Sequence, residues 1–313
     1  MVEDNTPKTL QQAIKYFSDD LLCINFIASL RWENGIAICP RCESDKTSFL
    51  STRKIWKCKA CKKQFSVKVG TIFEDSAIGL DKWLCAIWLI TNCKNGVSSY
   101  EIHRSIGVTQ KTAWFMLHRI RLAMQTGSFT KLSGDVECDE TFVGGKAKNM
   151  HKSKREKKIQ GRGSVGKTAV MGMLERKGKV FAKVVERVDR ETLHGEIEQN
   201  IETDSNVFTD EWRSYQGLND KYTHQVINHS IEYVRDNVHT NGIENFWSLL
   251  KRSIKGTYVS VEPFHLEKYV AEQTFRFNER KGKDKDRFLK VVGGVSGKRL
   301  TYEELIGYCS RQF

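Results

Sequence analysis

The chain has 313 residues, of which 39% are hydrophobic and 28% are charged, as is usual for a globular protein. It has no apolar run that reaches the roughly 18 residues of a transmembrane helix, so a membrane-spanning helix is not expected. The formal net charge is +13, from 51 basic and 38 acidic side chains. Because Lys and Arg neutralise phosphates, this excess favours a polyanionic partner, although a basic protein without one stays open.

The first 30 residues carry apolar side chains at helical spacing, including Leu10, Ile14 and Phe17, and predict one or two short supporting helices. The N-terminus lacks the basic-then-apolar pattern of a secretion signal. In such a chain the nine cysteines are expected to be thiols or metal ligands rather than disulfides. Five of them have no paired spacing and are expected in the core: Cys23, Cys85, Cys93, Cys138 and Cys309.

Two C-x2-C pairs lie in residues 31–75, Cys39 with Cys42 and Cys58 with Cys61, separated by 15 residues. This is the spacing of a structural zinc site. Each two-residue gap aims two thiolates at one ion, and two pairs close a tetrahedral shell with no open position. Four ordinary buried cysteines are the alternative. The alternating segments around the second pair predict a β-hairpin, so a small ribbon stabilised by Zn²⁺ is expected.

Residues 76–130 predict three helices. Asp81 is a candidate N-cap of the first, Ser98 or Ser99 of the second, and Thr109 of the third, with a turn at Gly107. This is the order of a helix-turn-helix, whose last helix can enter the major groove of DNA; an ordinary helical hairpin is the alternative. The candidate DNA-binding residues are Gln110, Lys111, Thr112 and Arg119.

From residue 131 the pattern becomes one of alternating strands and helices. Asp135, Glu137 and Asp139 share one face of the first strand, because side chains alternate along a strand. Four more strands are expected over 167–176, 179–188, 206–210 and 224–230, with helices over 190–201 and 241–256. Three consecutive strands followed by this alternation fit an RNase H-like α/β domain.

Carboxylates at three places suit metal-assisted phosphoryl transfer. Asp139 and Asp210 converge if their strands are neighbours, and Glu244 approaches from the helix. Two divalent ions held by carboxylates activate a nucleophile and stabilise the leaving oxygen, and Mg²⁺ prefers such oxygen ligands. The pattern alone does not favour Asp139 over Glu137, or Glu244 over Asp236.

The stretch between Lys146 and Lys167 is rich in Gly and Lys. It is predicted to be a loop that becomes ordered on DNA, just after Asp139. A solvated loop without this role is the alternative.

Three blocks, VECDETFVGGK, FTDEWRSY and HTNGIENFWSLLKR, follow one another in this order. They resemble the signature blocks of DDE transposases from bacterial insertion sequences, in particular the ISXO-like group related to the eukaryotic Merlin elements. The resemblance runs from about Phe17 to about Phe288. Some relatives carry Asn at the third acidic position. The resemblance assigns the catalytic acids to Asp139, Asp210 and Glu244, and a further basic residue to Lys251.

The resemblance implies a DNA transposase. The ribbon and helix-turn-helix would bind the terminal inverted repeats, and water would nick the ends with Mg²⁺ or Mn²⁺ bound. The freed 3′-hydroxyls would then attack target DNA, without a covalent protein–DNA intermediate. Lys251, two helical turns or roughly 10 Å from Glu244, is expected to bind a DNA phosphate. Synapsis of two ends implies at least a dimer on double-stranded DNA, in the cytoplasm of a bacterium with the nucleoid.

The expected architecture is multidomain α+β. It comprises an N-terminal helical segment (1–30), a four-cysteine zinc ribbon (31–75), a helix-turn-helix region (76–130) and an RNase H-like DDE catalytic domain (131–313). Two other functions stay open: a DNA-binding regulator whose RNase H-like domain is silent, and a nuclease of that fold that cuts without joining.

Overall fold

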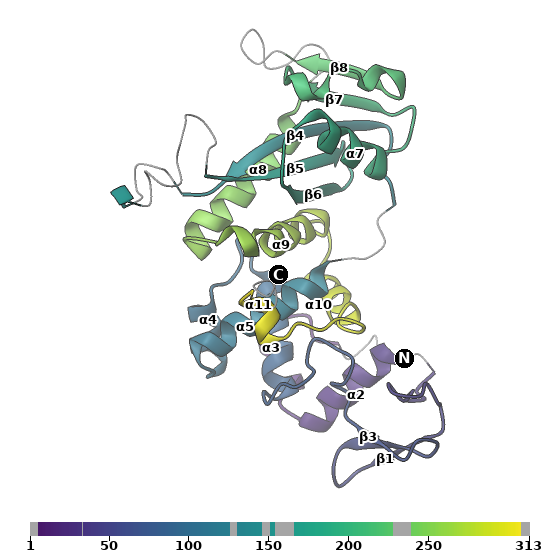
Figure 1. Cartoon of the computed structure of the whole chain (residues 1–313). Coiled ribbons are helices and arrows are strands. Elements are labelled where there is room, and N and C mark those ends of the chain that lie inside the picture. Colours follow the sequence, from purple (N-terminus) through teal and green to yellow (C-terminus); the bar gives the residue numbers. More distant parts are fainter. Residues whose placement is uncertain are drawn as a thin grey trace. The chain divides into compact units, whose positions relative to one another are not determined.

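The computed structural model describes residues 6–32, 34–125, 130–145, 151–153, 166–227 and 239–307. The chain divides into two units (Figure 1): Met1–Thr126 with Lys281–Phe313, and Gly127–Arg280. The segment expected as one domain over 131–313 is therefore divided between the two units. The reason is that its last helices pack on the helices of the first unit.

The first unit begins with helices α1 (Leu10–Tyr16) and α2 (Asp20–Arg31), where short helices are predicted. Their apolar side is covered by helix α10 (Asp284–Gly293). The ring of Phe17, which follows α1, lies 5.7 Å from that of Phe288 on α10, centroid to centroid. Burial of both rings explains why residues after 280 belong to this unit.

A small sheet follows, made of antiparallel strands β1 (Thr47–Leu50), β2 (Ile55–Cys58) and β3 (Gln64–Phe65). The predicted hairpin after the first cysteine pair is thus confirmed. Its core is little more than a few aromatic rings, among which Trp32 and Trp56 lie 5.0 Å apart. So small a core leaves much of the stability to a bound metal.

Three helices follow the ribbon in sequence: α3 (Leu80–Asn92), α4 (Ser99–Ile106) and α5 (Gln110–Met124). All three are in the expected places. Gly107 ends α4 with a φ of +63°, a left-handed conformation that glycine adopts at little cost. This glycine allows the sharp turn between α4 and α5.

The caps of these helices were predicted in two cases out of three. Ser98 caps α4 in a capping box with Glu101, and the Thr109 side chain accepts from a backbone N–H of α5. The prediction for α3 is wrong, because Gly79 is its N-cap and Asp81 lies in its first turn. There the carboxylate still favours the positive end of the helix dipole.

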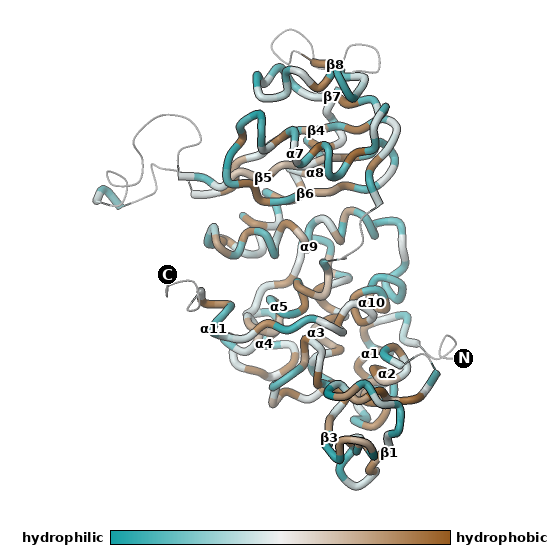
Figure 2. Tube along the Cα trace, turned by 45° about the vertical axis from the view of Figure 1, so that its right-hand side comes forward, coloured by the Kyte–Doolittle hydropathy of each residue, from teal (hydrophilic) through white to brown (hydrophobic). Residues whose placement is uncertain are grey.

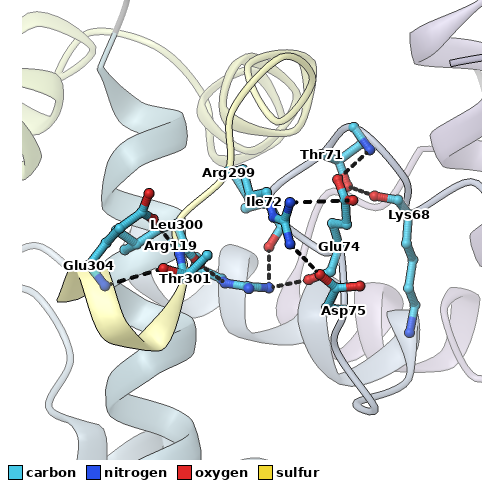
Figure 3. A network of polar contacts seen from close by, with 11 residues as sticks. Lys68, Thr71, Ile72, Glu74, Asp75, Arg119, Arg299, Leu300, Thr301 and Glu304 are labelled. Atoms are coloured by element: carbon cyan, nitrogen blue, oxygen red, sulfur yellow. Dashed lines mark hydrogen bonds and ion pairs between the residues drawn. The ribbon is translucent and has the colours of Figure 1, made fainter. Parts of the chain in front are cut away.

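Arg119 of α5 is buried, with 4% of its surface exposed. Figure 3 shows its guanidinium donating hydrogen bonds to the carbonyl oxygens of Leu300 (2.9 Å), Ile72 (2.9 Å) and Glu74 (2.7 Å). The expectation that Arg119 contacts DNA is therefore wrong for this structure. Its charge serves three backbone carbonyls and joins α5 to the segment before α11 (Tyr302–Leu305).

The second unit contains a five-stranded sheet of order β6-β5-β4-β7-β8. The β4–β5 and β5–β6 pairs are antiparallel, whereas β7 runs parallel to β4 and β8 parallel to β7. All five strands were predicted. Their bounds are β4 (Asp135–Val143), β5 (Thr168–Glu175), β6 (Val180–Val185), β7 (Asn206–Asp210) and β8 (Thr223–Ile227).

Helices cover both faces of this sheet, and Figure 2 shows brown, hydrophobic segments running through it. Val136 and Cys138 of β4 belong to a core shared with α7 (Arg190–Asn200). Alternate residues of the sheet belong to a second core, shared with α8 (Asn241–Ser253) and α9 (Leu266–Asn278). The acidic positions of β4 therefore face the α8 side.

The shorter helical segments of the second unit are η2 (Arg213–Tyr215), η3 (Leu218–Asp220), the π-helical η4 (Ile254–Tyr258) and η5 (Pro263–His265). Within the described ranges, no helix has the length and apolar character needed to cross a membrane.

Replacement of Arg119 tests its structural role. Arg119→Ala should lower the free energy of unfolding of the first unit by about 2–4 kcal/mol, because three buried carbonyls lose a charged donor. Arg104→Ala, an exposed arginine on α4, is the matched control and should change stability by less than about 0.5 kcal/mol. Calorimetric unfolding measures both. Equal stability of the two variants would contradict the buried role.

Candidate functional site

The four paired cysteines face one another. The Sγ atoms of Cys39 and Cys61 are 3.7 Å apart, those of Cys42 and Cys58 are 3.6 Å apart, and all four lie within 4.8 Å of one another. A tetrahedral ion with Zn–S bonds of about 2.3 Å places its sulfur atoms about 3.8 Å apart. The sulfur spacing therefore fits a structural zinc ion with four protein ligands.

Both cysteine pairs have the same backbone turn. Glu43 and Lys62, each directly after the second cysteine of a pair, have φ of +56° and +62°. The left-handed turn brings backbone N–H groups toward the sulfurs, and the Cys61 N–H lies 3.5 Å from the Cys58 Sγ. This hydrogen bond is the main reason that the pKa of Cys58 falls to about 6. The turn thus favours the thiolate, which is the metal-binding form.

The predicted DNA contacts at the start of α5 have different surroundings. Lys111 is exposed, and its Nζ lies 4.6 Å from the centre of the tyrosine ring of α11. Gln110 donates to the Ser99 hydroxyl at 2.8 Å, which joins α5 to α4. Thr112 shares a hydrogen bond with the capping hydroxyl of Thr109 at 2.8 Å. Of these three side chains, Lys111 is therefore the one that presents a charge at the surface.

Asp139 and Asp210 lie on neighbouring parallel strands. In the β4–β7 pair Glu137 lies opposite Phe208. Continuing that register by two residues puts Asp139 opposite Asp210, at the end of β7. Because side chains two residues apart share a face, both carboxylates lie on the α8 side of the sheet. The two strands are neighbours, as the expected convergence of Asp139 and Asp210 required.

The Asp139 carboxyl group lies in an unfavourable environment for a charge. Its pKa is raised to about 6, first by burial and then by the negative charge of Asp210, with a smaller effect of Glu244. Hydrogen bonds oppose this rise, including one of 2.9 Å from the Trp247 Nε1 to Oδ2. A cation beside these carboxylates would remove the repulsion.

Glu244 and Lys251 extend this environment along α8. The Glu244 Oε1 accepts a hydrogen bond of 3.2 Å from the Thr240 hydroxyl. Burial lowers the pKa of Lys251, and the charge of Asp139 opposes that shift. Among described residues, the cysteine cluster is the one group of three or more Cys, His, Asp or Glu whose ligand atoms all come within 4.8 Å. Asp139, Asp210 and Glu244 do not form such a group among the described residues.

Glu137 is buried, with 1% exposed, and it anchors the start of α8. Its Oε2 accepts from the backbone N–H of Ile243 at 2.9 Å, and its Oε1 accepts from the Arg176 Nε at 3.0 Å. Arg176 also donates to the carbonyl oxygen of His239 at 2.8 Å. One carboxylate thus joins β4, β5 and the first turn of the helix that carries Glu244.

Trp247 occupies the space that a glycine leaves. Gly172 of β5 pairs with Asp139, and a Cβ atom there would lie 2.6 Å from the Trp247 ring. The missing side chain lets the indole reach across β5 to hydrogen-bond Asp139. Trp247 is 4% exposed and belongs to the core shared by the sheet, α8 and α9.

Sequence reasoning did not identify the residues that position Asp139. Glu137 shares its strand face, which was the available signal, but its partner Arg176 had none. Glu140 was also missed, although burial and the charge of Asp139 raise its pKa to about 7.

Three sites named from the sequence lie outside the described residues. They are most of the loop between Lys146 and Lys167, the alternative acid Asp236, and Cys309.

The ribbon predicts a metal content. Purified protein should carry about one zinc per chain by elemental analysis. Cys42→Ser should lower that content and the unfolding temperature together, because one ligand of the closed shell is lost. Cys85→Ser, which changes a cysteine of α3, is the control and should keep the zinc. A folded wild type without zinc would contradict this site.

The Glu137 anchor predicts a large loss of stability. Glu137→Ala should reduce the free energy of unfolding of the second unit by about 3–5 kcal/mol, because the partly buried Arg176 loses its close charged partner and keeps the longer, 3.8 Å ion pair with Asp135. Glu137→Gln keeps an acceptor for the helix N–H and should cost less. Glu186→Ala, at an exposed position, should have little effect. Calorimetry compares the three, and a Glu137→Ala protein as stable as the control would exclude the anchor.

Comparison with known proteins gives matches in both units. Residues 131–278 match the model of the ISXO2-like transposase domain, and residues 18–64 match that of the transposase zinc-ribbon domain. The chain is 29% identical over 255 residues to an uncharacterized protein in transposable element ISH50 of Halobacterium salinarum, which covers 76% of this chain and 84% of that protein.

A second relative is an uncharacterized transposase-like protein of Haemophilus influenzae, 36% identical over 117 residues, or 37% of this chain and 94% of that protein. Among solved structures, a chain of a simian T-cell lymphotropic virus intasome bound to PP2A regulatory subunit B56 gamma matches 59% of this chain and 62% of its own length. Its TM-score of 0.26 and identity of 17% carry no argument. On the family models and the two relatives, the chain belongs to the ISXO2-like transposase family.

Proposed function

We propose that this chain is a DNA transposase that cuts and joins strands by metal-dependent phosphoryl transfer at Asp139, Asp210 and Glu244. The observation that carries the proposal is the register of β4 and β7. Continued by two residues, this register aligns Asp139 in the middle of β4 with Asp210 at the end of β7, and the charge of Glu244 on α8 acts on Asp139.

The sheet supports an RNase H-like catalytic domain. Three antiparallel strands occupy one side of its order, and two strands parallel to β4 occupy the other. Helices lie on both faces. In this arrangement Asp139, in the middle of the central strand β4, would lie level with Asp210 at the end of β7.

The carboxylates suit hard divalent cations such as Mg²⁺ or Mn²⁺, which prefer oxygen ligands. Bound there, two such ions about 3.5–4 Å apart would activate the attacking oxygen and stabilise the leaving one. Asp139, Asp210 and Glu244 would hold these ions together, because the charges of Asp210 and Glu244 both act on Asp139.

The remaining residues of the site orient these groups. Trp247 holds one oxygen of Asp139 with its Nε1 proton, which leaves the second oxygen for an ion. The backbone N–H of Trp212 donates to the Asp210 Oδ1 at 3.0 Å and fixes that carboxylate in the same way. Lys251 follows Glu244 by two helical turns and would bind a phosphate of the same DNA strand.

We further propose that helices α3 to α5 act as a helix-turn-helix and, with the zinc ribbon, recognise the terminal inverted repeats. Lys111 would contact phosphate or base edges at the start of α5, together with Gln110 and Thr112. Arg119 has no part in this interface. Pairing of two ends would require at least a dimer on the DNA.

A substitution at Asp210 tests the reaction. Asp210→Asn should keep DNA binding and lower Mg²⁺-dependent cleavage by at least about 100-fold, because an ion loses a charged ligand. Asp220→Asn, an exposed acid of the same unit, should cleave like the wild type. The substrate is the DNA that flanks the gene, which would carry the repeats, assayed for nicks and for joined products.

The same assay separates the alternatives. Cleavage with joining supports the transposase, and cleavage alone indicates a nuclease. Tight binding without cleavage by the wild type indicates a regulator. An Asp210→Asn protein that cuts at the normal rate would remove Asp210 from the site.

A further inference from the structure

A cavity of about 650 Å³ opens beside the end of β4 in the second unit. Its walls come from the last residues of β4, from Gly144 and Gly145 after it, from Lys167 before β5, and from the end of α8 with the segment that follows. This volume falls within the roughly 300–1,000 Å³ of small-molecule sites. The cavity therefore has room for a nucleotide unit.

Three lysines line this cavity, and no acidic side chain is among the described residues of its walls. Lys167, Lys251 and Lys255 are all exposed, and none of them forms an ion pair with any residue of the described ranges. The charges of Lys255 and Lys167 add to the burial that lowers the pKa of Lys251. The three ammonium groups therefore repel one another, and a bound polyanion would relieve this repulsion.

The rest of the lining is apolar, with side chains such as Phe142 and Ile254. A phosphate alone needs only the cationic groups. A nucleotide also offers a sugar and a base that lose water against an apolar wall. The mixture of lysines and apolar side chains thus fits a nucleic-acid strand better than a free inorganic anion.

The backbone at this cavity adopts two uncommon conformations. After α8 the chain continues as the π-helical η4, a form often found at functional sites. Val259 follows with φ +63° and ψ −55°, and the Ser260 N–H donates across it to the Tyr258 carbonyl oxygen at 2.6 Å. This is a tight γ-turn at a β-branched residue, a conformation that costs about 1–3 kcal/mol.

We propose that this cavity is a second phosphate-binding site, in which Lys167 and Lys255 hold the DNA backbone on the side of Lys251 away from the carboxylates. The site rests on the proposed function, since it takes the DNA strand that reacts at Asp139. From Glu244 through Lys251 to Lys255, α8 and η4 present one acid and then two cations along a single path. Lys167 closes that path from the opposite wall.

Lysine footprinting tests the site directly. The full-length protein is acetylated with an amine-reactive reagent, with and without a 30-base-pair duplex of arbitrary sequence and no added divalent metal, and the modified lysines are quantified by mass spectrometry. Acetylation of Lys167 and Lys255 should fall at least about fivefold with DNA. Lys177 and Lys179, exposed at the other end of β5, are the controls and should stay unchanged. Equal acetylation with and without DNA would overturn the proposal.

A second arm separates DNA from small anions. Inorganic phosphate, at the same total phosphate concentration as the duplex, should leave Lys167 and Lys255 unprotected, because only a strand places several phosphates along the cavity. Protection by inorganic phosphate equal to that by DNA would make the cavity a small-anion site and would overturn the assignment to DNA.

A pair of double variants measures the contribution to binding. Lys167→Gln with Lys255→Gln should reduce the slope of log K against log salt by about 1.8, since each duplex phosphate contact contributes about 0.9. Lys177→Gln with Lys179→Gln should leave the slope unchanged, and unfolding temperatures check that both proteins fold. Equal slopes for the two double variants would contradict the site.

The outcomes keep this inference apart from the proposed reaction. Protection of both lysines in a protein that never cleaves DNA would support the phosphate site and remove the proposed function. Normal cleavage with no protection would do the reverse.

Discussion

Repulsion between the carboxylates of Asp139, Asp210 and Glu244 is the main physical constraint on the proposed site of the second unit. The register of β4 and β7 places Asp139 beside Asp210, and α8 adds the charge of Glu244, so that the pKa of Asp139 rises to about 6. Carboxylates left to themselves would move apart or take up protons. Here the strand pairing, the indole of Trp247 and the buried carboxylate of Glu137 hold them in place. The fold therefore holds like charges close together, and the proposed divalent cations would relieve their repulsion.

In other parts of the chain, too, the backbone geometry fixes the position of charged or reactive groups. In the ribbon, two residues with left-handed backbone conformation follow the cysteine pairs, whose four thiols face one point. A bound zinc ion there would supply stability that the small core cannot. In α5, the buried guanidinium of Arg119 joins segments that are far apart in sequence. At the end of α8, three lysines and an unusual turn at Val259 line a cavity. Each case places charged or reactive groups by means of fixed backbone geometry.

The regular elements were predictable because they follow from local patterns. Alternation along β4, the spacing of the cysteines and the caps of α4 and α5 each involve residues within a few positions of one another. Whether Asp139 and Asp210 lie close together depends on which strands pair, and the sequence alone does not determine that pairing. Glu137 and Asp139 looked alike by pattern. They differ because only Glu137 meets Arg176 and the start of α8, and those contacts span 39 and 106 residues.

Arg119 shows the opposite failure. Its place on the last helix of a helix-turn-helix suggested DNA, but its partners are carbonyl oxygens 45 to 181 residues away. No local pattern reports such partners. The same holds for residues 281–307, whose helices follow the second unit in sequence but pack with the first unit through Phe288.

The central claim is that the carboxylates of β4, β7 and α8 bind metal together. The most direct measurement is a crystal structure of the protein with Mn²⁺, recorded at a wavelength where manganese scatters anomalously. The account predicts anomalous peaks within about 2.5 Å of the carboxyl oxygens of Asp139 and Asp210, with Glu244 on the same ions or bridged to them by water. Peaks only elsewhere on the protein, with these three carboxylates unoccupied, would contradict it.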